Sequence, residues 1–178
     1  MSKVIKKMII NQEWAMPNKE TFKIYPINKL LHRYTDNLDG VVLDPFSNGE
    51  KDFCTVNNDL NKSIDCDYHL DAVDFLKIFK EGTVDTVLYD PPYSPRQVSE
   101  CYKGVGKEVT QLDTSARFRS SHLDQIARVL KVGGRCISFG WNTNGVGKNR
   151  GFVTEEILIV KHGGSHNDTL VTVDIKVK

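Results

Sequence analysis

The order of hydrophobic and polar positions along the chain predicts short buried strands that alternate with amphipathic helices. Short apolar runs bounded by turn-forming pairs such as Asp-Pro, Asn-Asp and Glu-Gly are typical of buried strands. Apolar residues that recur every three or four positions indicate helices instead. The expected strands are 41–43, 53–56, 84–89, 136–139, 156–160 and 170–177, and the expected helices are 27–34, 72–79 and 115–130.

This alternation predicts an α/β fold with a mostly parallel sheet. Gly133-Gly134 follows the last expected helix and is a typical helix stop. The turn-rich segment 162–168 separates the last two strands, so these are expected to form an antiparallel C-terminal hairpin at one edge of the sheet.

Length and composition fit a single soluble domain over residues 1–178. The chain has 178 residues, of which 39% are hydrophobic and 26% charged. No apolar run approaches the roughly 18 residues that span a membrane, and the apolar triplet at 8–10 is too short for a signal peptide. The four cysteines form no C-x-x-C pair, which argues against a disulfide scaffold and a cysteine zinc site. We therefore expect a cytoplasmic protein without a membrane segment.

Charge is distributed unevenly along the chain. The net charge is +1, but residues 94–151 contain ten basic and four acidic residues. A basic segment in an otherwise acidic chain is a candidate contact surface for a polyanion, and a solvated lysine-rich face is the alternative. The residues expected to contact nucleic acid are Arg96, Lys103, Lys107, Arg117, Arg119, Lys148 and Arg150.

Acidic side chains follow several of the expected strands. Asp44, Asp59 and Asp90 each stand at a strand end, and Trp141 follows the strand at 136–139. Ligands of parallel α/β sheets bind at the carboxyl ends of the strands, so these residues predict a site for a polar ligand. Acids at such positions also serve as simple caps of helices and turns.

The most informative motif is Asp90-Pro91-Pro92-Tyr93, directly after an apolar strand. Two prolines fix two φ angles and donate no hydrogen bonds, so the loop is stiff and its carbonyls are free to accept. The Asp90 carboxylate and the Pro91 carbonyl suit the exocyclic amine of a planar base, and Tyr93 offers a ring for stacking. A stiff loop with a core tyrosine is the alternative reading of the tetrapeptide alone.

In its context, this motif resembles the signature of the N6-adenine DNA methyltransferases of the D-P-P-Y type, in particular small phage or mobile-element forms. The likeness extends over nearly the whole chain. Besides D-P-P-Y it rests on VVLDPFSNG at 41–49, ND at 58–59, DAVDFL at 71–76, RVLKVGG at 128–134 and the segment 22–27. It implies a Rossmann-like methyltransferase fold without a separate target-recognition domain, S-adenosylmethionine as the cofactor and no metal.

The resemblance also implies roles for single residues. Asp59 would hold the ribose of the cofactor and Asp71 its adenine, while Asp90, Pro91, Pro92 and Tyr93 would be catalytic. The implied cofactor contacts are Pro26, Ile27, Asp44, Pro45, Phe46, Asn48, Gly49, Asp59, Leu60, Asp71, Ala72 and Asp90. The partner would be DNA, either single-stranded or a duplex with its target adenine flipped out. A homodimer is compatible with the sequence.

The chain departs from the family pattern in two places. The cofactor loop at 46–50 has one glycine where the family usually has two or three. The step from Asp59 to Asp71 is so short that the helix between them is expected to be reduced or missing.

Two alternatives to DNA methylation stay open. One is methylation of an exocyclic amine in RNA or another substrate, and the other is a degenerate methyltransferase fold that only binds nucleic acid. His162 and His166 have an H-x3-H spacing, but the glycines between them favour a polar turn over a metal site.

Overall fold

The protein forms a seven-stranded sheet in a computed structural model that describes residues 7–111, 113 and 115–178. Residues 1–6 of the predicted domain lie outside the described residues, as do Leu112 and Thr114. The strands are β1 (Ile9–Trp14), β2 (Val42–Asp44), β3 (Val56–Asn57), β4 (Val84–Tyr89), β5 (Leu130–Gly140), β6 (Phe152–Lys161) and β7 (Thr169–Lys176). The helices are α1 (Tyr25–Thr35), α2 (Ala72–Lys77), α3 (Pro95–Gly104) and α4 (Ala116–Val129), with short 3-10 helices η1 (Thr21–Lys23) and η2 (Lys148–Arg150).

The strand order is β1-β6-β7-β5-β4-β2-β3, and every strand except β7 runs in the same direction. The prediction of a mostly parallel sheet with an antiparallel C-terminal hairpin is therefore confirmed, but the hairpin does not form the edge of the sheet, because β1 pairs with the outer side of β6. Because the six other strands are parallel, their carboxyl ends all meet at one edge of the sheet. Among the described residues, no helix is long and apolar enough to cross a membrane.

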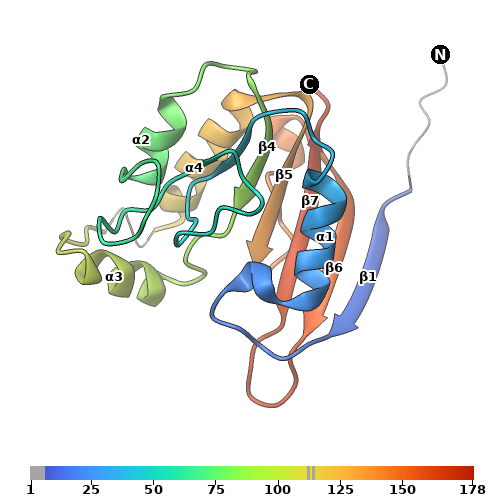
Figure 1. Cartoon of the computed structure of the whole chain (residues 1–178), viewed down its shortest axis with the longest axis horizontal. Helices are drawn as coiled ribbons and strands as arrows, with labels where there is room; N and C mark the ends of the chain where they lie inside the picture. The colour runs from blue at the N-terminus through green and yellow to red at the C-terminus, as the bar shows by residue number, and fades with distance from the viewer. Residues whose placement is uncertain (1–6, 112, 114) are drawn as a thin grey trace.

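Helices cover both faces of the sheet and create two apolar cores (Figure 1). On one face α1 packs its buried Ile27, Leu30 and Leu31 against β5, β7 and β6. On the other face α2 and α4 bury apolar side chains against β2, β4 and β5. In Figure 1, α3 lies apart from the sheet, on the left below α2. The fold therefore leaves the carboxyl edge bordered by loops and by α3.

Two elements are present that the sequence pattern did not indicate. Strand β1 pairs in parallel with β6 at the outer edge of the sheet, and all six of its residues are exposed, so it lacks an apolar alternation. Helix α3 lies in the stretch between the expected strand 84–89 and the expected helix 115–130, for which no element was expected. Its N-terminus is a capping box, in which Ser94 accepts from the Gln97 N–H and Gln97 reaches back to the Ser94 N–H.

Several other elements differ in length from the prediction: β6 is Phe152–Lys161 where 156–160 was expected, and α2 ends at Lys77. The second strand is only Val56–Asn57, because Phe53 lies in a turn and the chain bends at Thr55 just before it. Strand β5 begins at Leu130, directly after α4, and continues through Gly133-Gly134, where a helix stop was expected. Gly133 has φ 88°, and a β-carbon on Gly134 would lie 3.0 Å from the Asp85 carbonyl oxygen, so these glycines permit an irregular start of the strand.

The predicted loss of the helix between Asp59 and Asp71 is confirmed. Residues 60–70 are all described and contain turns but no helix. Side-chain hydrogen bonds hold this loop in place: Asn58 Nδ2 donates to the Pro45 and Leu70 carbonyls, each at 3.0 Å.

Candidate functional site

The carboxyl edge of the sheet brings together the acids that the sequence placed at strand ends. Asp44 closes β2, Asp90 follows β4, and Asp59 stands two residues after β3. A groove joins Asp59 and Asp90, whereas Asp44, a predicted cofactor contact, is fully buried and lines none of the cavities at this edge. A hollow of about 450 Å³ is lined by Asp59, Asp90 and the Pro91-Pro92-Tyr93 loop, and it shares residues with deeper cavities on either side.

The loop after β2 lines the groove and turns sharply at Asn48 and its single glycine, Gly49. Asn48 and Gly49 both have positive φ, 47° and 82°. A β-carbon at position 49 would lie 3.1 Å from the Ile64 side chain, so glycine is required for both conformation and space. The turn is fixed from the neighbouring strand end, because Asp59 Oδ2 accepts from the Asn48 N–H at 3.1 Å.

One side of the groove is a largely apolar cavity of about 330 Å³ between the β2 loop, the loop after β3, the N-terminus of α2 and the helix α3. Seven of the predicted cofactor contacts line it: Pro45, Phe46, Asn48, Asp59, Leu60, Asp71 and Ala72. Tyr102 and His122 also line it and were not predicted as site residues. The spacing of the buried Val98 and Tyr102 on α3 is the sequence signal that could have indicated Tyr102.

Asp71 caps α2 and faces this cavity. Its Oδ1 accepts from the Val73 N–H at 3.2 Å, while its Oδ2 accepts from Tyr102 Oη at 3.1 Å and Lys107 Nζ at 2.9 Å. Partial burial alone would raise the pKa of Asp71, but the hydrogen bond and charge of Lys107 outweigh it and hold the pKa below its usual value. Asp71 is therefore a carboxylate at neutral pH.

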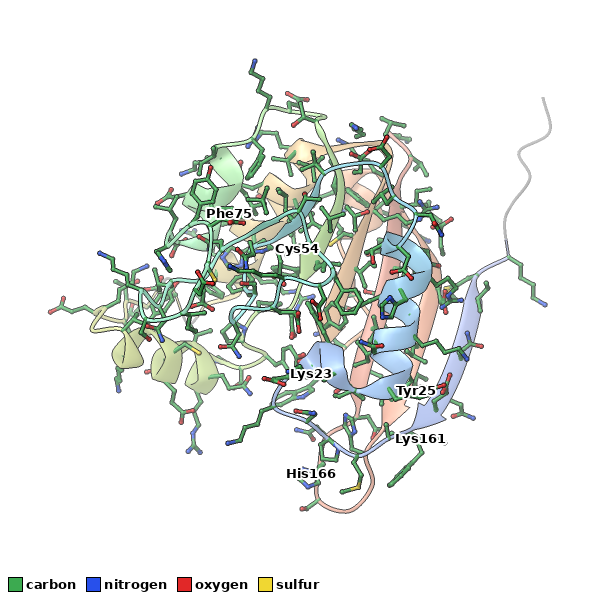
Figure 2. All side chains as sticks on the ribbon, in the orientation of Figure 1. Lys23, Tyr25, Cys54, Phe75, Lys161 and His166 are labelled. Atoms are coloured by element: carbon green, nitrogen blue, oxygen red, sulfur yellow. The ribbon has the colours of Figure 1, made fainter. Side chains whose placement is uncertain are left out.

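The other side of the groove is a polar hollow of about 250 Å³ between the β2 loop and the N-terminal segment 19–23. Its charged lining residues are Lys19, Glu20 and Lys23 from that segment and Glu50, Asp52 and Asp90 from the sheet side, so acids outnumber lysines there. Figure 2 shows Lys23 on the 3-10 helix η1, near the carboxyl ends of the strands.

The structure does not bring Pro26 and Ile27, two predicted cofactor contacts, to either cavity. Both are buried on α1, and Ile27 is fully enclosed in the core between α1 and the sheet. The residues that reach the groove from the N-terminal segment stand a few positions earlier, at Lys19 to Lys23, because the chain turns into α1 at Tyr25.

Asp44 is completely buried, and only one of its two carboxyl oxygens has a hydrogen-bond partner among the described residues. Its Oδ1 accepts from the Phe46 N–H at 3.0 Å, but its Oδ2 has no hydrogen-bond partner among the described residues. Burial, and then the nearby Asp90, Asp59 and Glu50, raise the pKa of Asp44 well above its usual value. The raised pKa favours the protonated carboxyl, which avoids the penalty of about 1–3 kcal/mol or more for an unpaired buried charge.

Asp90 and Tyr93 are hydrogen-bonded to each other. The Tyr93 hydroxyl donates to Asp90 Oδ1, and the Tyr93 ring packs edge-on against Trp141, with 5.6 Å between ring centroids. Burial raises the pKa of Asp90, and the bond from Tyr93 acts in the opposite direction. Burial also raises the pKa of Tyr93, so its hydroxyl keeps its proton. Gln97 fixes the backbone here by accepting from the Tyr93 N–H at 2.7 Å.

Several basic side chains of the segment 94–151 are paired with acids, so fewer of them are available to a polyanion than the sequence suggested. Arg96, Lys107, Lys131, Arg135 and Arg150 each lie within 2.9 Å of a carboxylate oxygen. Arg150 also donates to Ser120 and to the Val146 carbonyl, so it fastens η2 to α4.

Of the other predicted nucleic-acid contacts, Lys148 also lies on η2, and Arg119 stacks over the Tyr89 ring at 5.6 Å. For Lys103 and Arg117, we find no acid within ion-pair distance in the described part of the chain.

The histidines have structural roles. His162 lies 2.8 Å from the Ala15 carbonyl through Nδ1 and 2.9 Å from Thr169 through Nε2. The described residues contain no cluster of three or more potential metal ligands. His122 is buried against Phe118 and Tyr89, and burial lowers its pKa to about 4, so it stays neutral.

Neither a protein-family model nor a curated protein matches this sequence. Among solved structures, TrmN from Thermus thermophilus matches with a TM-score of 0.56 and 19% identity over 86% of this chain and 49% of that one. The 1,6-didemethyltoxoflavin-N1-methyltransferase of Burkholderia thailandensis, solved with S-adenosylhomocysteine, gives a TM-score of 0.56 and 12% identity over 86% of this chain and 77% of that one.

An rRNA methylase from Streptococcus thermophilus matches with a TM-score of 0.52 and 12% identity over 92% of this chain and the whole of its own length. The chain spans about half the length of TrmN. At these identities the comparisons establish the fold, which is the Rossmann-like α/β fold of methyltransferases.

Proposed function

We propose that the chain is an S-adenosylmethionine-dependent methyltransferase that transfers a methyl group to the N6 amine of adenine in DNA. One observation carries the proposal. The Asp90 carboxylate stands at a strand end on a stiff Pro-Pro-Tyr loop, in a groove that continues past Asp59 into a cavity closed by Asp71.

The residues of the groove fit the cofactor. The largely apolar cavity suits an adenine ring, and Asp71 and Asp59 offer carboxylates to an amino group and to ribose hydroxyls. The polar hollow contains Lys19, which suits a carboxylate, while Lys23 pairs there with Glu20 at 2.6 Å. The acids that line the same hollow, Glu50, Asp52 and Asp90, suit an ammonium group. Together these residues would hold a ligand with a nucleoside at one end and an amino acid at the other.

The bound cofactor supplies an electrophilic methyl group on a sulfonium. The acceptor amine is a weak nucleophile, because its lone pair is delocalised into the base. Asp90 accepts one hydrogen of this amine and stabilises the positive charge that grows on the nitrogen during transfer. The Pro91 carbonyl is the expected second acceptor. The raised pKa of Asp90 suits it to take the proton that the methylated amine releases. The groove walls align amine and methyl group, and such positioning supplies much of the acceleration.

The decisive experiment is methyl transfer from tritiated S-adenosylmethionine to a panel of single-stranded DNA, duplex DNA and RNA, followed by digestion and identification of the labelled nucleoside. We expect N6-methyladenine in DNA. Asp90→Ala should reduce the rate about 10²–10³-fold, the usual loss for a preorganised contact to developing charge. Asp39→Ala, which removes an exposed acid away from the groove, is the control.

The same experiment separates the alternatives. Label in an RNA nucleoside only would assign the chemistry to another amine acceptor. Nucleic-acid binding without label in any nucleoside, combined with no cofactor binding in calorimetry, would favour the degenerate binding subunit.

A further inference from the structure

Helix α3 forms the roof of the largely apolar cavity and spans both halves of the site. Its first turn begins at Ser94, directly after the Asp90 to Tyr93 loop. Its last turn contributes Cys101, Tyr102 and Gly104 to the cavity lining. A movement of α3 would therefore open the cavity and disturb the catalytic loop together.

The two ends of α3 are fixed in different ways. At the N-terminal end, Gln97 Oε1 accepts from the backbone N–H groups of both Tyr93 and Ser94, at 2.7 and 3.1 Å, which is a local contact within one turn. At the C-terminal end, the contacts are long-range. Tyr102 Oη and Lys107 Nζ both donate to Asp71 Oδ2, across more than 30 positions of sequence.

These C-terminal contacts form one unit. The Lys107 ammonium lies 4.2 Å from the centroid of the Tyr102 ring, so it contacts both the ring and the carboxylate. The side chains of Lys107 and Asp71 are 40% and 26% exposed, so the ion pair is accessible to water and can open without unfolding the core. Through these hydrogen bonds, α3 and the residues after it are joined to Asp71, which lines the cavity at the N-terminus of α2.

We propose that Lys107 and Tyr102 belong to the cofactor site, where they fasten α3 over the bound nucleoside by holding Asp71. The identity of the nucleoside ligand rests on the proposed function. Lys107 then acts as a positioning residue that sets how fast the ligand leaves. This role differs from the phosphate contact that the charge pattern predicted for Lys107. In the absence of nucleic acid, replacing Lys107 changes ligand release in the first role and has no effect in the second.

The first test measures S-adenosylhomocysteine binding without nucleic acid, by calorimetry for the Kd and by stopped-flow displacement for the dissociation rate. Lys107→Met should accelerate dissociation about two- to fivefold, the range for a part-exposed ion pair. Tyr102→Phe should have a similar effect, and the double variant should show less than the product of the two, because both side chains act on one oxygen. Lys107→Arg, which keeps the charge, should restore slow release.

Lys103→Met is the matched control, because it removes the same charge from the last turn of α3, where no ion pair to Asp71 is present. Rising salt should accelerate release from the parent and from Lys103→Met, but not from Lys107→Met. Equal dissociation rates for the parent, Lys103→Met and Lys107→Met would overturn the proposal. So would a loss confined to DNA affinity, which is the result expected for a phosphate contact.

The second test needs no ligand. Hydrogen exchange of the backbone amides of α3 should be faster in Lys107→Met than in Lys103→Met, and unchanged exchange would refute the fastening. If the parent bound no S-adenosylhomocysteine, the proposed function would fail, while the exchange result would still decide whether Lys107 fastens α3.

Discussion

Tyr93→Phe is the substitution that best tests how the catalytic loop works. It removes the hydroxyl that donates to Asp90 Oδ1 and keeps the ring that packs against Trp141. If Tyr93 acted only as a stacking platform, the substitution would be almost silent. The structure gives the hydroxyl a second role, since its hydrogen bond stabilises the charged form of Asp90 and lowers a pKa that burial raises.

The sign of the effect follows from this balance. Without the hydroxyl, the pKa of Asp90 rises further, so the working carboxylate is lost at a higher pH. A hydrogen bond to a charged group contributes about 1.5–3 kcal/mol, and the part-exposed position of Asp90 reduces this to about 1–2 kcal/mol. At 1.36 kcal/mol for each factor of ten, we expect a rate about 5–30-fold lower on the acidic side of the profile. On the alkaline plateau the loss should be smaller.

The assay is single-turnover methyl transfer measured from pH 5 to pH 9, with the cofactor saturating. Tyr25→Phe is the matched control, because Tyr25 is 70% exposed at the start of α1 and its hydroxyl has no role in the groove. A Tyr93→Phe profile that overlaid the parent profile at every pH would refute the reasoning and leave stacking as the role of Tyr93. A loss equal at all pH values would show that the hydroxyl acts without changing the protonation of Asp90.

Two further predictions concern the basic surface and the core. Lys103→Met and Arg117→Met should each flatten the dependence of log K on log salt for DNA binding by about one unit, whereas Arg150→Met should leave it unchanged, because Arg150 is engaged by Asp124 and Ser120. An equal effect of all three in fluorescence titrations would count against this division. Glu156→Ala should lower the free energy of unfolding in urea by about 1–3 kcal/mol, because this buried carboxylate accepts from Arg33, Tyr34 and Asn11. The exposed Glu81→Ala is its control, and a difference of less than about 0.5 kcal/mol between them would contradict the assignment.

The parts of the fold that the sequence predicted are those with strong local signals. The apolar run before Asp90 and the two prolines after it define both a strand and its end, and the structure agrees at β4. The acids at 44, 59 and 90 could be placed at one edge because parallel strands share their carboxyl ends. The apolar stripe of 115–130 likewise gave α4 to within a residue or two.

The parts that the sequence could not predict depend on residues far apart in the chain. Strand β1 has no apolar alternation, and its place is fixed by a partner strand that follows about 145 positions later. The sequence overestimated the number of unpaired basic side chains in the segment 94–151. The ion pairs of Arg150 with Asp124 and of Arg135 with Glu155 join residues that only folding brings together. The capping box at Ser94 and Gln97 is a local signal for α3 that the glycine-rich and polar surroundings obscured.

The pairing of β1 with β6 has a consequence for synthesis on the ribosome. Ile9 lies opposite Glu156 in the sheet, so β1 cannot take its place until synthesis has passed β6. Strand β1 has no partner strand until that moment, and contacts of such long sequence separation form slowly. Strand β1 therefore leaves the ribosome long before it is fixed in the sheet, and this slowly folding outer edge is where nascent chains of the protein are most exposed to pairing with one another.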